Sequence, residues 1–140
     1  MRKILGIDYG KIITGLSITD EKQIFAFGLK AIPTKKLMNF LESFFYQEQI
    51  DIIVIGLPIK LNNQKISFIE TDIQKFINEF HIKYPKMIIE RLDERFTSKI
   101  ASHTMKELGL KKKRNKKILN KISATIILQS YLKRKENIDL

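Results

Sequence analysis

Short apolar runs recur along the chain with polar connections between them, and five of these runs predict β-strands. The first covers residues 3–8, and the next two, 15–19 and 24–32, are separated by a connection short enough for a β-hairpin. Residues 51–56 are almost continuously apolar, as expected of a strand buried on both faces. A fifth strand is predicted at residues 87–92.

Four longer segments repeat apolar residues every three to four positions, which predicts amphipathic helices. They cover residues 35–48, 67–83, 97–108 and 118–134, and Gly109 is placed to end the third. The helical spacing also predicts which side chains face the core. These are the aromatic residues Phe40, Phe44, Phe45, Phe68, Phe76 and Phe80, and in the last helix Ile118, Ile122, Ile126, Leu128 and Leu132.

This order of elements predicts an α/β fold in which a hairpin and helix-connected strands form one mixed sheet, with helices on both faces. In such sheets, functional sites form at the carboxyl ends of the central strands. The polar residues that directly follow the strands are therefore the first places to search for chemistry.

Composition narrows the classes of function. The 140 residues suit a single domain, residues 1–140, and the absence of Cys excludes thiolate zinc sites and thiol nucleophiles. The 26 Lys and Arg against 15 Asp and Glu give a net charge of +11, which favours a polyanionic partner. The longest apolar run, residues 52–59, is far shorter than the ~20 residues of a spanning helix. Asp8 interrupts any signal-peptide core, so a cytoplasmic protein is expected.

Two strand ends carry candidate catalytic residues. Asp8 ends the first strand and is followed by Tyr9 and Gly10, so its carboxylate could hold a divalent metal beside a phosphate. After the fifth strand come Asp93 and Glu94, then Arg95, which could bind a phosphate in bidentate fashion. Thr97 and Ser98 could cap the following helix and leave its amides for an anion. Alternatively, Asp8 is a plain turn residue, and the acids simply pair with Arg95.

Two further segments point to nucleic acid. Gly56, Leu57 and Pro58 end the central strand and lead into Lys60, which could line the same cleft. Residues 111–117 form a basic loop in which only Asn115 is uncharged; its cations are Lys111, Lys112, Lys113, Arg114, Lys116 and Lys117. Such a dense run favours phosphate contacts over a merely solvated loop. Tyr9 and Phe96 flank the candidate site and could stack on a base, although packing is the favoured role.

Together these motifs resemble the YqgF/RuvX family of small RNase H-like proteins, described as pre-16S rRNA nucleases or Holliday junction resolvases. The resemblance runs from Lys3 to about Leu132. The residues that carry it are Leu5–Gly10, Gly15–Leu16, Gly56–Pro58, Asp93–Ser98 and Ile122–Leu132. It implies an RNase H-like fold with a five-stranded mixed sheet.

The resemblance also implies a catalytic site. In the family, carboxylates at the first strand, at the Asp-Glu-Arg motif and at the start of the last helix bind Mg²⁺ or Mn²⁺. By position these are Asp8 and Glu94, with Asp93 beside the latter, but the third position holds Asn120. The Lys-Arg pair usual after the first glycine is also absent, because Ile12 and Ile13 follow Lys11.

Three functions follow from this resemblance. The favoured one is a metal-dependent endonuclease that matures the 5′ end of 16S rRNA. The second is a nucleic-acid-binding assembly factor whose nuclease site has decayed, which the loss of a charged ligand at Asn120 favours. The third is a resolvase of branched DNA. The sequence leaves open whether the chain is a monomer or a homodimer.

Overall fold

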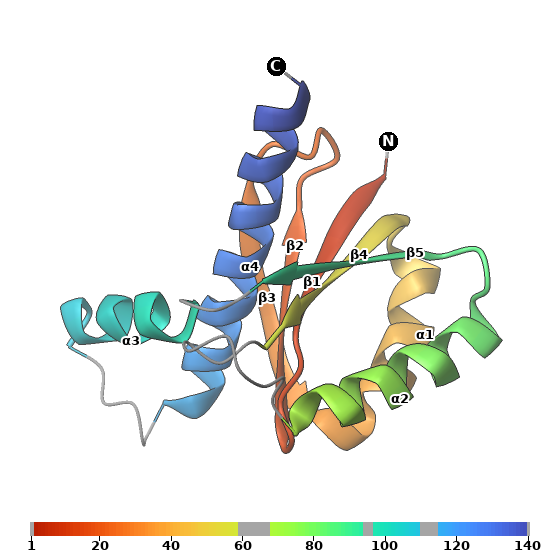
Figure 1. The fold of residues 1–140 in the computed structure, drawn as a ribbon, viewed down its shortest axis with the longest axis horizontal. Coiled ribbons are helices and arrows are strands. Elements are labelled where there is room, and N and C mark those ends of the chain that lie inside the picture. The colour runs from red at the N-terminus through yellow and green to blue at the C-terminus, as the bar shows by residue number, and fades with distance from the viewer. Residues whose placement is uncertain (1, 59–67, 94–96, 110–114, 140) are drawn as a thin grey trace.

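A computed structural model of the chain describes residues 2–58, 68–93, 97–109 and 115–139. Its centre is one five-stranded sheet with the order β3-β2-β1-β4-β5 (Figure 1). The strands are β1 (Lys3–Asp8), β2 (Ile13–Thr19), β3 (Ala26–Pro33), β4 (Ile50–Leu57) and β5 (Ile88–Asp93). The β1–β2 and β2–β3 pairs are antiparallel, whereas β1–β4 and β4–β5 are parallel. The predicted mixed sheet is thereby confirmed.

Helices cover both faces of this sheet, as predicted. They are a 3₁₀ turn (Thr34–Lys36), α1 (Leu37–Gln47), α2 (Ile69–Lys83), α3 (Thr97–Glu107) and α4 (Lys116–Asp139). Helices α1 and α2 lie on one face and α4 on the other, with α3 packed against the outer side of α4 (Figure 1). Helix α3 is followed by Gly109 at a φ of 73°, and the Gly109 amide donates a hydrogen bond to the carbonyl of Lys106 (3.0 Å). None of the described helices has the length and apolarity that crossing a membrane requires.

The central strand β4 explains why helices must pack on both faces of the sheet. Alternate side chains of β4 enter different cores: Ile53 and Ile55 pack under α1 and α2, while Ile52 and Val54 pack under α4. Strand side chains alternate between faces, so a run of apolar residues can be buried only when both faces are covered.

The prediction that Phe68 lies in the core is wrong, since its side chain is 94% exposed. Phe68 precedes the first residue of α2, so it does not share the buried face of that helix, which includes Ile73, Phe76 and Phe80.

The predicted buried face of α4 is also wrong in part. Leu128 is fully buried and Leu132 packs against the same core cluster, but Ile118, Ile122 and Ile126 are only partly buried. The residues that meet the sheet are Ala124, Ile127, Leu128 and Tyr131. Ile122 and Ile126 instead line a cavity of about 420 Å³ together with Ile100 of α3. The helix therefore divides its apolar residues between two partners, which a single periodic stripe does not reveal.

Candidate functional site at the carboxyl edge of the sheet

The parallel strands β1, β4 and β5 end at the same edge of the sheet, as the sequence analysis expected. Ile7 of β1 is in register with Ile55 of β4, and Leu57 of β4 with Asp93 of β5. Asp8 therefore stands level with Gly56, one residue from the end of β4. The carboxylates that end β1 and β5 are thus brought to a common edge although 85 positions separate them in the chain (93 − 8).

The two aspartates nevertheless belong to opposite faces of the sheet. Ile4 packs under α4, and Gly6 lies against Ala124 and Leu128 of that helix, so alternation assigns Asp8 to the α4 face. On β5, Leu92 packs in the α4 core, so Asp93 belongs to the face of α1 and α2. Asp8 is half-buried and Asp93 is exposed.

Asn120 is brought to Asp8 by the packing of α4 on β2. Gly15 is the antiparallel partner of Asp8, and a Cβ added to Gly15 would overlap the backbone carbonyl of Asn120. Only a residue without a side chain allows the helix this close an approach. The beginning of α4 consequently lies next to the strand pair that carries Asp8.

Two further contacts hold α4 in this position. The hydroxyl of Ser17 on β2 donates a hydrogen bond to the carbonyl of Ala124 over 2.7 Å in a buried environment. A Cβ on Gly6 would collide with the Ser17 hydroxyl and approach Leu128. Small residues on β1 and β2 therefore fix the height of α4 above the sheet, and with it the position of Asn120.

The structure leaves several predicted site residues untested. Lys60, Glu94, Arg95 and Phe96 and the basic residues Lys111, Lys112, Lys113 and Arg114 lie outside the described residues. Thr97 and Ser98 form the first turn of α3, as predicted, but their side chains also lie outside the description. Within the described part of the chain, no group of three or more acidic or histidine side chains could hold a metal ion.

The described cations of the candidate site are exposed. Lys11 follows the end of β1, and the neighbouring Ile12 is 76% exposed. Lys116 and Lys117, predicted to belong to a loop, instead form the first turn of α4, which contains no acidic residue. Cations at a helix N-terminus oppose its dipole, so an anion bound there would be favourable to both.

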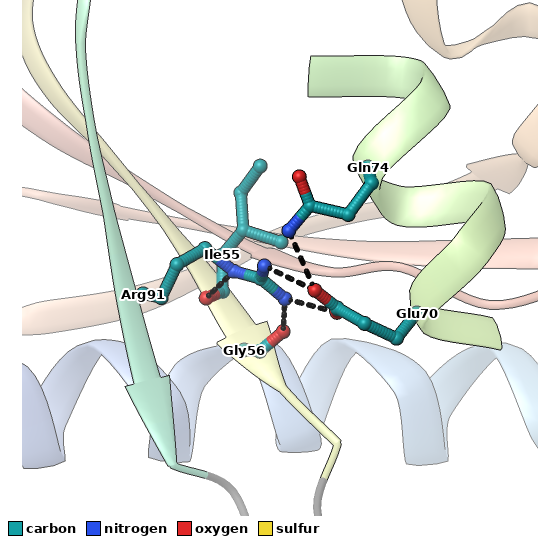
Figure 2. A network of polar contacts seen from close by, with 5 residues as sticks. All are labelled: Ile55, Gly56, Glu70, Gln74 and Arg91. Carbon is teal, nitrogen blue, oxygen red and sulfur yellow. Dashed lines mark hydrogen bonds and ion pairs between the residues drawn. The ribbon is translucent and has the colours of Figure 1, made fainter. Parts of the chain in front are cut away.

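An ion pair that the sequence analysis did not anticipate lies beside this edge. The Arg91 guanidinium on β5 donates to both carboxylate oxygens of Glu70 on α2, over 2.8 and 2.6 Å (Figure 2). It also donates to the backbone carbonyls of Ile55 (3.2 Å) and Gly56 (2.9 Å). Gln74 donates a further hydrogen bond to Glu70 over 2.7 Å.

This network ties the start of α2 to the end of β4, and Arg91 stands only two residues before Asp93. The hydrogen bonds from Arg91 lower the pKa of Glu70, against the opposing effect of its burial. The sequence offers little indication of this ion pair. Arg91 stands two residues before the Asp that ends its strand, but no local pattern identifies Glu70, 21 positions earlier, as its partner.

The packing role favoured for Tyr9 is confirmed. Its half-buried ring lies 5.7 Å from that of Phe76 on α2, measured between ring centres. Burial and the nearby carboxylates of Asp72 and Glu79 raise the pKa of its phenol. The phenol therefore stays protonated at neutral pH and can donate a hydrogen bond.

Comparison with known proteins shows which family and which relatives this chain is similar to. A family model described as "RuvX: Holliday junction resolvase" matches residues 2–134. A protein of Flavobacterium psychrophilum named "Putative pre-16S rRNA nuclease" is 48% identical over 138 residues, covering 96% of this chain and 99% of that protein. One of the same name from Karelsulcia muelleri is 49% identical over 138 residues, covering 95% and 99%.

Solved structures support the fold. The structure titled "T. thermophilus RuvC in complex with Holliday junction substrate" superposes with a TM-score of 0.57 at 10% identity and covers 96% of each chain. The fowlpox virus Holliday junction resolvase gives a TM-score of 0.51 at 14% identity, covering 94% of this chain and 99% of that one. Both the resolvase-like, RNase H-like architecture and the family expected from the sequence are confirmed. The chain belongs to the RuvX family.

Proposed function

We propose that this protein is a metal-dependent endonuclease that processes the 5′ end of precursor 16S rRNA. The names of relatives up to 49% identical over almost the whole chain support this substrate. The net charge of +11 fits a polyanion. The observation that carries the proposal is the approach of α4 to β2, which sets Asn120 beside the strand pair that ends in Asp8.

The donor groups at this edge fit a hard divalent cation. Asp8 offers carboxylate oxygens, and Asn120 offers a neutral oxygen that Mg²⁺ or Mn²⁺ can accept in place of a third carboxylate. We assign the second carboxylate to Glu94, with Asp93 as a neighbour on the other face. The chemistry that the metal supplies when bound is activation of water for attack on a phosphodiester and stabilisation of the leaving oxygen.

The remaining residues bind and orient the RNA. Arg95 and the first turn of α3, with Thr97 and Ser98, bind the phosphate that is cut. The cations around the edge hold the backbone on either side: Lys11, Lys60, Lys111, Lys112, Lys113, Arg114, Lys116 and Lys117. Because phosphate contacts release counterions, binding must weaken steeply as salt is raised.

This salt dependence tests the role of the lysines in the first turn of α4. Replacing Lys116 or Lys117 with Ala should reduce the slope of log binding constant against log salt by about 0.7–0.9 for each phosphate that is no longer neutralised. Lys86→Ala, at an exposed lysine preceding β5 at the opposite end of the sheet, should leave the slope unchanged. Slopes that fall equally in all three variants would indicate a diffuse charge effect rather than phosphate binding at the helix start.

The test of the activity is cleavage of a labelled precursor 16S rRNA 5′ fragment with Mg²⁺ or Mn²⁺, comparing the natural protein with Asp8→Asn. Asp51→Asn is the matched control, because Asp51 lies at the opposite end of the parallel strands. We expect metal-dependent cleavage that Asp8→Asn abolishes and Asp51→Asn preserves. Salt-sensitive RNA binding without cleavage in all three proteins would instead establish a binding factor on a nuclease fold.

A second candidate function is resolution of branched DNA. The description of the matching family favours it, as does the superposition on a resolvase bound to a junction. A four-way DNA junction offered in competition with the RNA separates the two functions, since the preferred substrate suppresses cleavage of the other. Symmetric cuts in the junction, with sedimentation as a dimer, would favour the resolvase.

A further inference from the structure

A separate cavity opens beside the candidate site, on the α1 and α2 face of the sheet. It has a volume of about 300 Å³, and Tyr9, the residue after Asp8, forms part of its wall. Phe76 of α2 and Met38 of α1 also line it. A partly apolar cavity with an aromatic wall therefore borders the carboxyl edge of the sheet, on the face opposite to that of Asp8.

The wall of this cavity is held in place by hydrogen bonds. The Thr34 hydroxyl donates to the Gly10 carbonyl over 2.7 Å and lies 2.8 Å from the hydroxyl of Thr14. The Thr34 amide donates to the Ile12 carbonyl over 2.8 Å. Gly10 and Ile12 are thus tied to the turn that precedes α1, and the ring of the adjacent Tyr9 is held against Phe76 without a ligand. Such preorganisation lowers the entropic cost of binding.

The charges around the cavity identify the kind of group it suits. Two lysines, Lys35 and Lys75, and two acids, Asp72 and Glu79, line it, so their charges cancel in a chain of net charge +11. Because the cations and carboxylates are equal in number, the cavity offers a phosphate no net attraction. A flat, uncharged group with both donors and acceptors fits better, because it can stack on Tyr9 and hydrogen-bond to the polar rim.

We propose that this cavity receives one unpaired nucleobase of the RNA strand, at the point where the strand passes over the carboxyl edge of the sheet. The inference rests on the proposed function and adds to it a means of fixing the register of the strand. Stacking of a base on an aromatic side chain is sequence-tolerant, so the cavity selects an unpaired nucleotide near the cut rather than a long sequence. Tyr9 acts here as a specificity-determining residue.

The test is a set of RNA fragments in which each nucleotide around the cleavage position is replaced in turn by an abasic one. Binding is measured without a divalent metal, so the result does not depend on catalysis. We expect one abasic position to weaken binding by the natural protein about tenfold. Tyr9→Ala weakens binding of the intact RNA by the same factor and adds no further loss at that position. Tyr46→Ala, at a side chain 89% exposed on α1, is the matched control and changes nothing.

Met38→Trp provides a second variant, because it fills the cavity without removing the contact between Tyr9 and Phe76. Met38→Trp should weaken binding of the intact RNA by the same factor as the single abasic position weakens binding by the natural protein. If all abasic fragments bind the natural protein equally, or if the losses from Tyr9→Ala and the abasic nucleotide add, the cavity proposal is overturned while the nuclease remains. Displacement of the RNA by micromolar free nucleoside would overturn the cavity proposal too, because that result would identify the cavity as a site for a separate small molecule. Base-dependent binding without any cleavage would leave the cavity and remove the nuclease.

Discussion

Arg91 and Glu70 form a two-pronged ion pair whose carboxylate oxygens lie 2.8 and 2.6 Å from the guanidinium, with the Glu70 side chain only 9% exposed. The same guanidinium binds the last carbonyls of β4, so one side chain joins a helix, the central strand and the edge strand. Removing one partner would leave a charge with little water and no counter-charge, whereas removing both would not.

Glu70→Gln should therefore lower the free energy of unfolding by about 3 kcal/mol, measured by urea denaturation at neutral pH. Adding Arg91→Met should recover part of that loss. Glu42→Gln, which breaks the half-exposed pair of Glu42 with Lys83, is the control and should cost much less than Glu70→Gln. Equal losses from the Glu70 and Glu42 variants would contradict the structural role of the pair.

The same pair predicts how stability depends on pH. Arg91 lowers the pKa of Glu70 in the folded chain below its ordinary value of 4.5, so the unfolded chain takes up this proton first as the pH falls. The stabilisation is complete above 4.5 and is lost as the pH falls through the lowered pKa. The difference in unfolding free energy between the natural protein and Glu70→Gln should thus be constant from neutral pH to about pH 6 and shrink below the ordinary carboxyl pKa. A gap that stays constant into strong acid would show that Glu70 does not titrate with folding.

Gly15→Ala should displace the start of α4, because the added methyl meets backbone rather than a flexible side chain. We expect a loss of about 1–3 kcal/mol in unfolding free energy, together with reduced cleavage. Gly28→Ala is the matched control: its Cβ would meet the stem of the Lys121 side chain and the Thr125 hydroxyl, which are side-chain atoms and yield more readily than backbone. The two variants should differ clearly in thermal unfolding, and similar melting temperatures would argue against the tight approach at Gly15.

The opposite faces of Asp8 and Asp93 predict unequal effects on activity. Asp8→Asn should abolish metal-dependent cleavage, whereas Asp93→Asn should lower it only about tenfold, as expected of a neighbour of the ligands. Cleavage rates of both variants at several metal concentrations distinguish a metal ligand from a neighbour of the ligands. Loss of all activity in Asp93→Asn would assign that aspartate to the metal instead.

Asn120→Asp adds a negative charge near Asp8 and near the N-terminus of α4. Without a divalent cation the added carboxylate and Asp8 repel each other, so the variant should unfold more easily than the natural protein unless Mg²⁺ is present. Cleavage should rise and need less Mg²⁺, because a carboxylate binds this ion better than an amide. If Mg²⁺ does not stabilise the variant and its metal dependence is unchanged, Asn120 does not contribute to the metal site.

Hydrophobic periodicity in the sequence determined the order and type of the elements, because burial on one or two faces imposes a local pattern on each strand and helix. Asp8, the polar residue that ends an apolar strand, could be assigned to the functional edge for the same reason. Phe68 was misassigned because a helical pattern does not show where the first turn begins, and its exposed side chain lies just outside α2.

Only the tertiary structure decided how the elements meet. The packing of alternate strand residues against α4 assigned Asp8 and Asp93 to different faces, and the bare backbone of Gly15 let the Asn120 backbone approach the strand pair that carries Asp8, from over 100 positions away (120 − 8 = 112). The Arg91 side chain pairs with Glu70 across the end of β4, and residues of α1 and α2 complete the cavity beside Tyr9. These relationships depend on long-range distances between side chains, which a local pattern of apolar and polar residues does not encode.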